Sequence, residues 1–142
     1  MITIQVPGKP VPQPRHRVDS RGIHYLPKDH PVRGFKARVR VLARSKCNSP
    51  LEGPVAVSVL LSIRKPKSLP KYKTWCDKKP DIDNYMKAVL DALNRIAYKD
   101  DGQIASIEFR KVYADNEMTL INIWELSHGE KESQRGCRSS GS

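Results

Sequence analysis

The run from Asp81 to Ile96 constrains the fold of this chain more than any other part of the sequence. It is typical of an α-helix that packs one face on a core, because its apolar residues recur at three- and four-residue spacing. Pro80 and Asp81 supply signals for the start of a helix. The helix needs an apolar layer to cover. The stripe consists of Ile82, Tyr85, Met86, Val89, Leu90, Leu93 and Ile96.

Alternating apolar residues elsewhere predict a sheet that supplies this layer. A second helical pattern runs from Val32 to about Lys46. The order of elements predicts an α+β fold: a mixed β-sheet with two helices packed on it, in a single domain over residues 1–127. Residues 128–142 lack apolar periodicity, and we expect a disordered C-terminal tail. The predicted strands are Ile2–Val6, a short one at Ile23–Leu26, Val55–Ile63, Ile104–Tyr113 and Met118–Leu126.

Charge is distributed unevenly along the chain. Residues 1–80 hold 18 Lys and Arg against 4 Asp and Glu, whereas residues 81–142 hold 8 against 11. The basic part is suited to a polyanion, because binding phosphates releases their counterions. An acidic patch in the same protein would repel that polyanion unless a cation lies between them. Nucleic acid is therefore the expected partner.

Residues 64–80 are predicted to form a long basic loop, since three prolines break the segment. Tyr72 and Trp75 lie among its charges, and two interpretations of Trp75 remain open: stacking on exposed bases, or packing on the core to hold the loop. The candidate nucleic-acid-binding residues are Arg15, Arg17, Arg64, Lys65, Lys67, Lys71, Lys73, Lys78 and Lys79.

Cysteine and histidine spacing argues against other kinds of site. Cys47, Cys76 and Cys137 are far apart and form no CxxC pair, which disfavours a disulfide framework and a structural zinc site. We expect a reducing, cytoplasmic compartment. The four histidines are scattered, the N-terminus lacks the apolar core of a secretory signal, and no apolar run is long enough to span a membrane.

The acidic residues around the best helix predict a metal site. Two aspartates flank Ile82, and Asp101 follows the helix in an Asp-Asp-Gly turn. Mg²⁺ prefers oxygen ligands, and it commonly takes one or two carboxylates plus substrate phosphate. Asp81, Asp83 and Asp101 would hold the ion for phosphodiester hydrolysis, with Lys87 stabilising the transition state. The helix is about 22 Å long. Asp101 can therefore meet Asp83 only if the chain doubles back or a second subunit supplies it.

Each of these residues also has a purely structural interpretation. Asp81 or Asp83 could cap the helix, and Asp101 with Gly102 could be a plain turn. Lys87 and Asp91 could form a surface pair. The chain would then be a DNA-binding module without catalysis. A nuclease for other branched DNA is a further alternative.

The segment DIDNYMKAVLDAL, residues 81–93, resembles the core of the RusA-type Holliday junction resolvases, which are crossover junction endodeoxyribonucleases. That core has two aspartates flanking an apolar residue, then Asn, a Lys, a D-A-L helix and an Asp-Asp turn, which here is Asp100–Asp101. The resemblance is specific over residues 81–104 and looser over residues 2–17 and 54–64.

The resemblance implies a homodimeric, Mg²⁺-dependent endodeoxyribonuclease of phage or prophage-like origin. Such proteins act in DNA recombination and repair, and they resolve four-way junctions by paired, symmetric nicks. The family's metal-binding aspartates fall on Asp81, Asp83 and Asp101, and its important lysine falls on Lys87. A homodimer also suits the substrate, because a four-way junction has two-fold symmetry.

Overall fold

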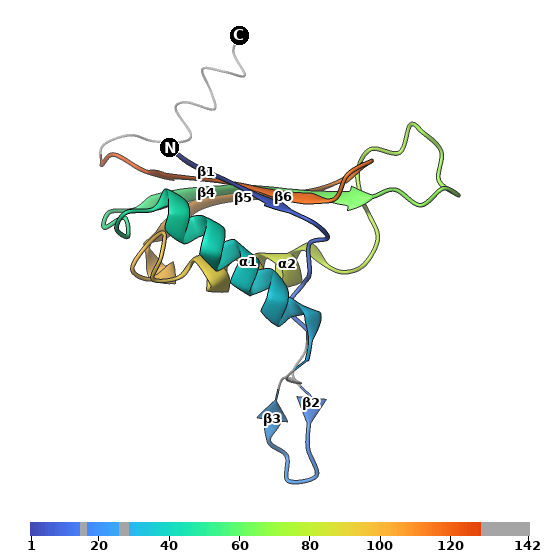
Figure 1. Cartoon of the computed structure of the whole chain (residues 1–142), viewed down its shortest axis with the longest axis horizontal. Coiled ribbons are helices and arrows are strands. Elements are labelled where there is room, and N and C mark those ends of the chain that lie inside the picture. The colour runs from blue at the N-terminus through green and yellow to red at the C-terminus, as the bar shows by residue number, and fades with distance from the viewer. Residues whose placement is uncertain (15–16, 26–28, 129–142) are drawn as a thin grey trace.

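A four-stranded mixed sheet forms the centre of the protein (Figure 1), in the order β1–β6–β4–β5. The computed structural model describes residues 1–14, 17–25 and 29–128, with the backbone alone at residues 17, 24 and 25. Strands β4 and β5 run parallel, and the other neighbours are antiparallel. The predicted α+β class is confirmed. The strand bounds are β1 Ile2–Pro7, β4 Val55–Arg64, β5 Ile104–Ala114 and β6 Met118–Glu125.

Both predicted helices are confirmed, and they cover the same face of the sheet (Figure 1). They are α1, Pro31–Lys46, and α2, Ile82–Leu93. His30 caps α1, because its Nδ1 accepts a hydrogen bond from the Val32 amide at 3.1 Å. The alternation of β4 places every second residue under the helices. The core between the layers includes Val55, Val57, Val59 and Leu61 of β4, Val32, Phe35, Val39 and Ala43 of α1, and Tyr85, Ala88, Val89, Ala92 and Leu93 of α2.

Helix α2 is shorter than its apolar stripe predicts. It ends at Leu93, and Arg95 has a left-handed backbone with φ of 69°. A left-handed residue just after a helix is a common way to end it, although glycine is more usual there. The chain then reverses, and the Arg95 amide donates to the Tyr98 carbonyl oxygen at 2.7 Å. Ile96 still packs against the core although it lies outside the helix.

A small hairpin extends away from the layers. Strands β2 (Arg17–Val18) and β3 (His24–Tyr25) form a small hairpin that projects on the helix side (Figure 1). Strand β3 falls within the predicted strand Ile23–Leu26, whose last residue lies outside the described residues, as does most of the predicted tail. No helix among the described residues is long and apolar enough to cross a membrane.

The basic segment 65–80 leaves β4 as the predicted loop, but its last third returns to the sheet. The Cys76 amide donates to the Lys111 carbonyl oxygen at 3.1 Å, and the Tyr113 amide donates to the Thr74 carbonyl oxygen at 2.8 Å. Trp75 thereby forms a bridge with Val112 on the outer edge of β5. The loop is therefore attached to β5 only a few residues before α2 begins.

Candidate active site

Asp81 occupies the N-cap position of α2, but its carboxylate makes no capping hydrogen bond. The structural interpretation of Asp81 as a cap therefore holds for its backbone and not for its side chain. The Nζ of Lys111 fixes the approach to the helix, since it donates to the carbonyl oxygens of Lys78 at 2.6 Å and Pro80 at 2.8 Å. The exposed Asp81 lines a pocket of about 670 Å³ together with Ile82, residues 75–79 and residues 109–111.

The polar side of α2 carries alternating charges. Asp83 is exposed in the first turn, where the helix dipole stabilises a carboxylate. Lys87 and Asp91 follow at four-residue intervals, so all three side chains lie along one side of the helix. Asp91 forms a 2.7 Å ion pair with Lys36 of α1. The contact between α1 and α2 is thus partly ionic.

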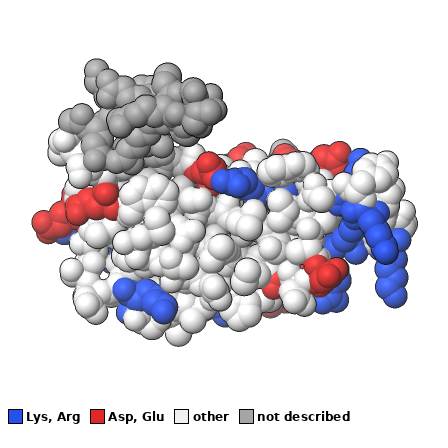
Figure 2. All heavy atoms as spheres, turned by 90° about the horizontal axis from the view of Figure 1, so that it is seen from above, with Lys and Arg blue, Asp and Glu red and all other residues white. Residues whose placement is uncertain are grey.

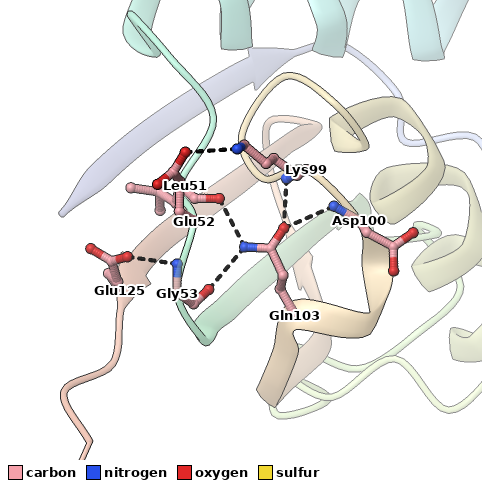
Figure 3. A network of polar contacts seen from close by, with 7 residues as sticks. All are labelled: Leu51, Glu52, Gly53, Lys99, Asp100, Gln103 and Glu125. Atoms are coloured by element: carbon pink, nitrogen blue, oxygen red, sulfur yellow. Dashed lines mark hydrogen bonds and ion pairs between the residues drawn. The ribbon is translucent and has the colours of Figure 1, made fainter.

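The two adjacent aspartates after α2 have different environments, and Figure 3 shows that of Asp100. Asp100 caps the short 3-10 helix η1, Asp101–Gln103, and accepts a hydrogen bond from the Gly102 amide at 2.8 Å. Gln103 accepts from the Lys99 and Asp100 amides and donates to the carbonyl oxygens of Leu51 and Gly53. We call this cluster the turn network: Leu51, Gly53, Lys99, Asp100 and Gln103. Asp101 is not a member of it.

Asp101 lies back along α2 instead of beyond its end. The reversal after Leu93 brings the buried Tyr98 beside the helix, where its hydroxyl donates to the Leu90 carbonyl oxygen at 2.8 Å. Burial raises the pKa of Tyr98 well above its usual value, and the adjacent Asp101 carboxylate raises it further. The chain therefore doubles back, and it carries Asp101 to the part of α2 that holds Lys87, Leu90 and Asp91, although not to Asp83.

Asp101 and Lys87 line one pocket of about 620 Å³ between the two helices. Cations and carboxylates face the same space, which can hold a phosphate group and a cation together. We call it the interhelical pocket. Its lining residues are Gln13, Arg33, Lys36, Lys87, Leu90, Asp91 and Asp101.

The three predicted metal ligands do not meet at one point in the single chain. Asp81 and Asp101 line different pockets, and Asp83 lines neither. Across residues 1–14, 17–25 and 29–128, no three His, Cys, Asp or Glu side chains are placed to hold a metal ion. The assignment of Asp81, Asp83 and Asp101 as joint ligands stays a prediction.

The basic loop presents its charges at one end of the molecule. Figure 2 shows Lys and Arg side chains gathered at the end where the loop lies. Arg64, Lys65 and Lys67 line one shallow pocket there, and Lys78 and Lys79 line the pocket of Asp81. Lys71 is exposed, and Lys73 is 4.0 Å from the Asp77 carboxylate. Arg15 lies outside the described residues, as does the side chain of Arg17.

The exposure of Trp75 decides between the two interpretations that the sequence leaves open, stacking on bases and packing on the core. Its side chain is 62% exposed, and that of Tyr72 is 78% exposed, so neither ring belongs to the core. The buried neighbour Cys76 and the backbone bonds to β5 hold the loop instead. The indole is thus available at the surface beside Asp81.

Sequence reasoning missed several residues of the interhelical pocket, namely Gln13, Arg33 and Lys36. Lys36 belongs to a helix with many cations, and nothing in its spacing distinguishes it from Arg38 or Arg40. Gln13 lies in a proline-rich segment far from α2 in sequence, and its amide donates to the Asn84 carbonyl oxygen at 2.9 Å. Only a conserved pairing between segments 7–14 and 81–91 could have revealed this contact.

The chain is similar to known proteins over most of its length. Residues 7–124 match a protein family described as "Endodeoxyribonuclease RusA". The chain is also 33% identical over 138 residues to "Uncharacterized protein YqaN" of Bacillus subtilis (strain 168). That alignment covers 89% of this chain and 97% of the relative.

Proposed function

Because this chain belongs to the RusA family of endodeoxyribonucleases, we propose that it is a Mg²⁺-dependent nuclease that resolves Holliday junctions. It would cut by paired symmetric nicks, in DNA recombination and repair. The family match spans most of the chain and includes both helices, strands β4 and β5, nearly all of β6 and the Asp81–Asp101 segment.

The observation that carries this proposal is the return of Asp101 to the polar side of α2. It joins Lys87 in a pocket that is lined by further cations from α1. A carboxylate beside several cations suits phosphodiester hydrolysis, since the first can hold a metal ion and the others can bind phosphate oxygens. Asp100, by contrast, is occupied as a cap.

The donors of the site fit Mg²⁺ by their chemistry. This ion takes oxygen ligands, and it usually completes one or two protein carboxylates with water and substrate phosphate. Asp81, Asp83 and Asp101 are the proposed ligands. When bound, the ion would polarise the scissile phosphate and lower the pKa of a water molecule. Lys87 would place positive charge beside the phosphate as negative charge develops.

A homodimer is part of the proposal. A four-way junction presents two equivalent strands related by a two-fold axis, and a C2 dimer presents two equivalent sites to them. The basic loop and the exposed Trp75 would contact DNA next to Asp81, with the loop cations binding phosphates and the indole stacking on an unpaired base.

A labelled four-way junction tests the reaction. With Mg²⁺, the wild-type protein should make paired nicks at symmetric positions, and EDTA should abolish them. Asp83→Asn should remove cleavage while junction binding persists, and Asp115→Asn, in the exposed β5–β6 turn, is the matched control. Binding without nicking in both Mg²⁺ and Mn²⁺ would leave a DNA-binding module and reject the nuclease.

Salt dependence tests the role of the loop. Each phosphate contact contributes about 0.9 to the slope of log K against log salt concentration on duplex DNA. Replacing Lys78 and Lys79 by Ala should therefore flatten the slope by up to roughly 1.8. Lys99, which pairs with Glu52 at 2.7 Å, provides the control substitution. An unchanged slope would show that these two lysines do not contact phosphate.

A further inference from the structure

Lys36 is unusual among the charged residues of α1. The core stripe of this helix includes Val32, Phe35 and Val39. Lys36 is next to Phe35 in sequence, and its side chain is only 12% exposed. Lysines are rarely buried to this degree without a partner, because the ammonium group must be removed from water. Its place in the fold therefore needs an explanation.

Asp91 is that partner, and it contacts two cations of α1. The Lys36 Nζ is 2.7 Å from the Asp91 Oδ2, and an Arg40 guanidinium nitrogen is 4.0 Å from the same oxygen. The Asp91 side chain is 58% exposed, so the lysine bears most of the burial. A pair that served only to clamp two helices would not require its cation to face a pocket, yet Lys36 lines the interhelical pocket.

The pocket has the composition of an anion-binding site. Arg33, Lys36 and Lys87 outnumber its two carboxylates. Gln13 adds a buried Oε1 that has no hydrogen-bond partner in the described part of the chain. A buried acceptor without a partner is costly, and a water molecule that accompanies a bound phosphate could donate to it, whereas the phosphate oxygens could not.

We propose that Lys36 binds a phosphate of the DNA strand at the nuclease site, and that Asp91 positions it there. This inference rests on the proposed function. The Lys36 ammonium has three N–H donors, of which the Asp91 carboxylate uses one, so the others can reach a phosphate oxygen without breaking the ion pair. The substrate would thus be bound by cations from both helices, Lys36 of α1 and Lys87 of α2.

Junction binding by full-length protein in the Asp83→Asn background tests this assignment. Lys36→Met keeps the apolar stem and removes the charge, and Lys36→Arg restores the charge. We expect Lys36→Met to raise Kd about tenfold at low salt and to flatten the salt slope by about 0.9. Lys36→Arg should recover most of both losses. Lys46→Met, at the exposed end of α1, should change both the Kd and the salt slope by less than Lys36→Met does.

A purely structural role would give a different pattern. If Lys36 only clamps the helices, Lys36→Met and Asp91→Asn should lower Tm together and leave the salt slope of the folded protein unchanged. That result would overturn the inference. A changed slope, together with a wild-type protein that binds the junction but never cleaves it, would instead support phosphate binding and reject the nuclease. Wild-type protein that neither binds nor cuts the junction would overturn both.

Discussion

The turn network and the interhelical pocket are both polar, and both adjoin the turn at residues 98–103, but their hydrogen bonding differs. In the turn network, the Gln103 side chain makes four hydrogen bonds of 2.7–2.9 Å, and Asp100 caps η1 (Figure 3). In the pocket, the Gln13 Oε1 has no partner within the described residues, and Asp101 takes no part in the cap.

This difference suggests that the turn network serves stability and that the interhelical pocket serves activity. A saturated network has little capacity for a ligand, and removing one member exposes several unsatisfied groups. A pocket with incompletely satisfied polar groups contributes less to folding and retains the capacity to bind. We therefore expect substitutions in the turn network to lower the free energy of unfolding, and substitutions in the pocket to lower activity.

Asp101→Asn should have the largest effect, and on activity alone. It removes the charge of a proposed metal ligand while it keeps the shape of the side chain, so single-turnover junction cleavage should fall by at least about 100-fold. Tm should match that of the wild type, with Asp115→Asn as the control. A large fall in Tm with normal cleavage per folded molecule would show that Asp101 stabilises the fold and does not act in cleavage.

Gln103→Ala should have the largest effect on stability. It leaves two backbone amides and the carbonyl oxygens of Leu51 and Gly53 without their side-chain partner. We expect the free energy of unfolding to fall by about 2 kcal/mol, measured by urea denaturation. Gln5→Ala, on an exposed position of β1, is the control. Equal stability of the two variants would break the contrast between the clusters.

Asp100→Ala compares the neighbours directly. Loss of the cap to the Gly102 amide should cost about 1 kcal/mol of unfolding free energy, whereas Asp101→Ala should cost much less. Paired urea titrations of the two variants measure the difference. The contrast between these aspartates fails if Asp100→Ala reduces cleavage as much as Asp101→Ala does.

Tyr98→Phe should have the smallest effect, because the Leu90 carbonyl oxygen also accepts from the Asn94 amide. We expect a loss of about 0.5 kcal/mol at neutral pH. The pKa of Tyr98 is raised by burial, so the folded protein disfavours the phenolate. The stabilisation from Tyr98 is complete below the unfolded pKa of about 10 and is lost as pH rises above it.

Unfolding at alkaline pH can check this sign. The stability difference between wild type and Tyr98→Phe should shrink above roughly pH 10 and should be constant between pH 6 and 9. Tyr72→Phe, at an exposed position, is the control variant. A difference that grows with pH would mean that the phenolate is favoured in the fold.

Much of the fold was predictable because the spacing of apolar residues within a single helix or strand shows which of its faces is buried. The alternation in Val55–Ile63 predicts the buried face of β4. In α2, Tyr85, Val89 and Leu93 of the predicted stripe are buried together with Ala88 and Ala92, whereas Ile82, Met86 and Leu90 are half-buried. The end of α2 was predicted three residues too late, because Ile96 continues the apolar stripe. Arg95 has a left-handed backbone, but an arginine, unlike a glycine, does not indicate one in the sequence.

The sequence by itself determined the two layers, the basic loop and the motif that links Asp81, Asp83, Lys87 and Asp101. Only the tertiary structure decided that Asp100 caps η1 while Asp101 reaches the pocket, and that Lys36 and Gln13 join it there. The physical reason is that spacing along a chain fixes neighbours within one element. Contacts between α1, α2 and the segment before α1 depend on how elements pack.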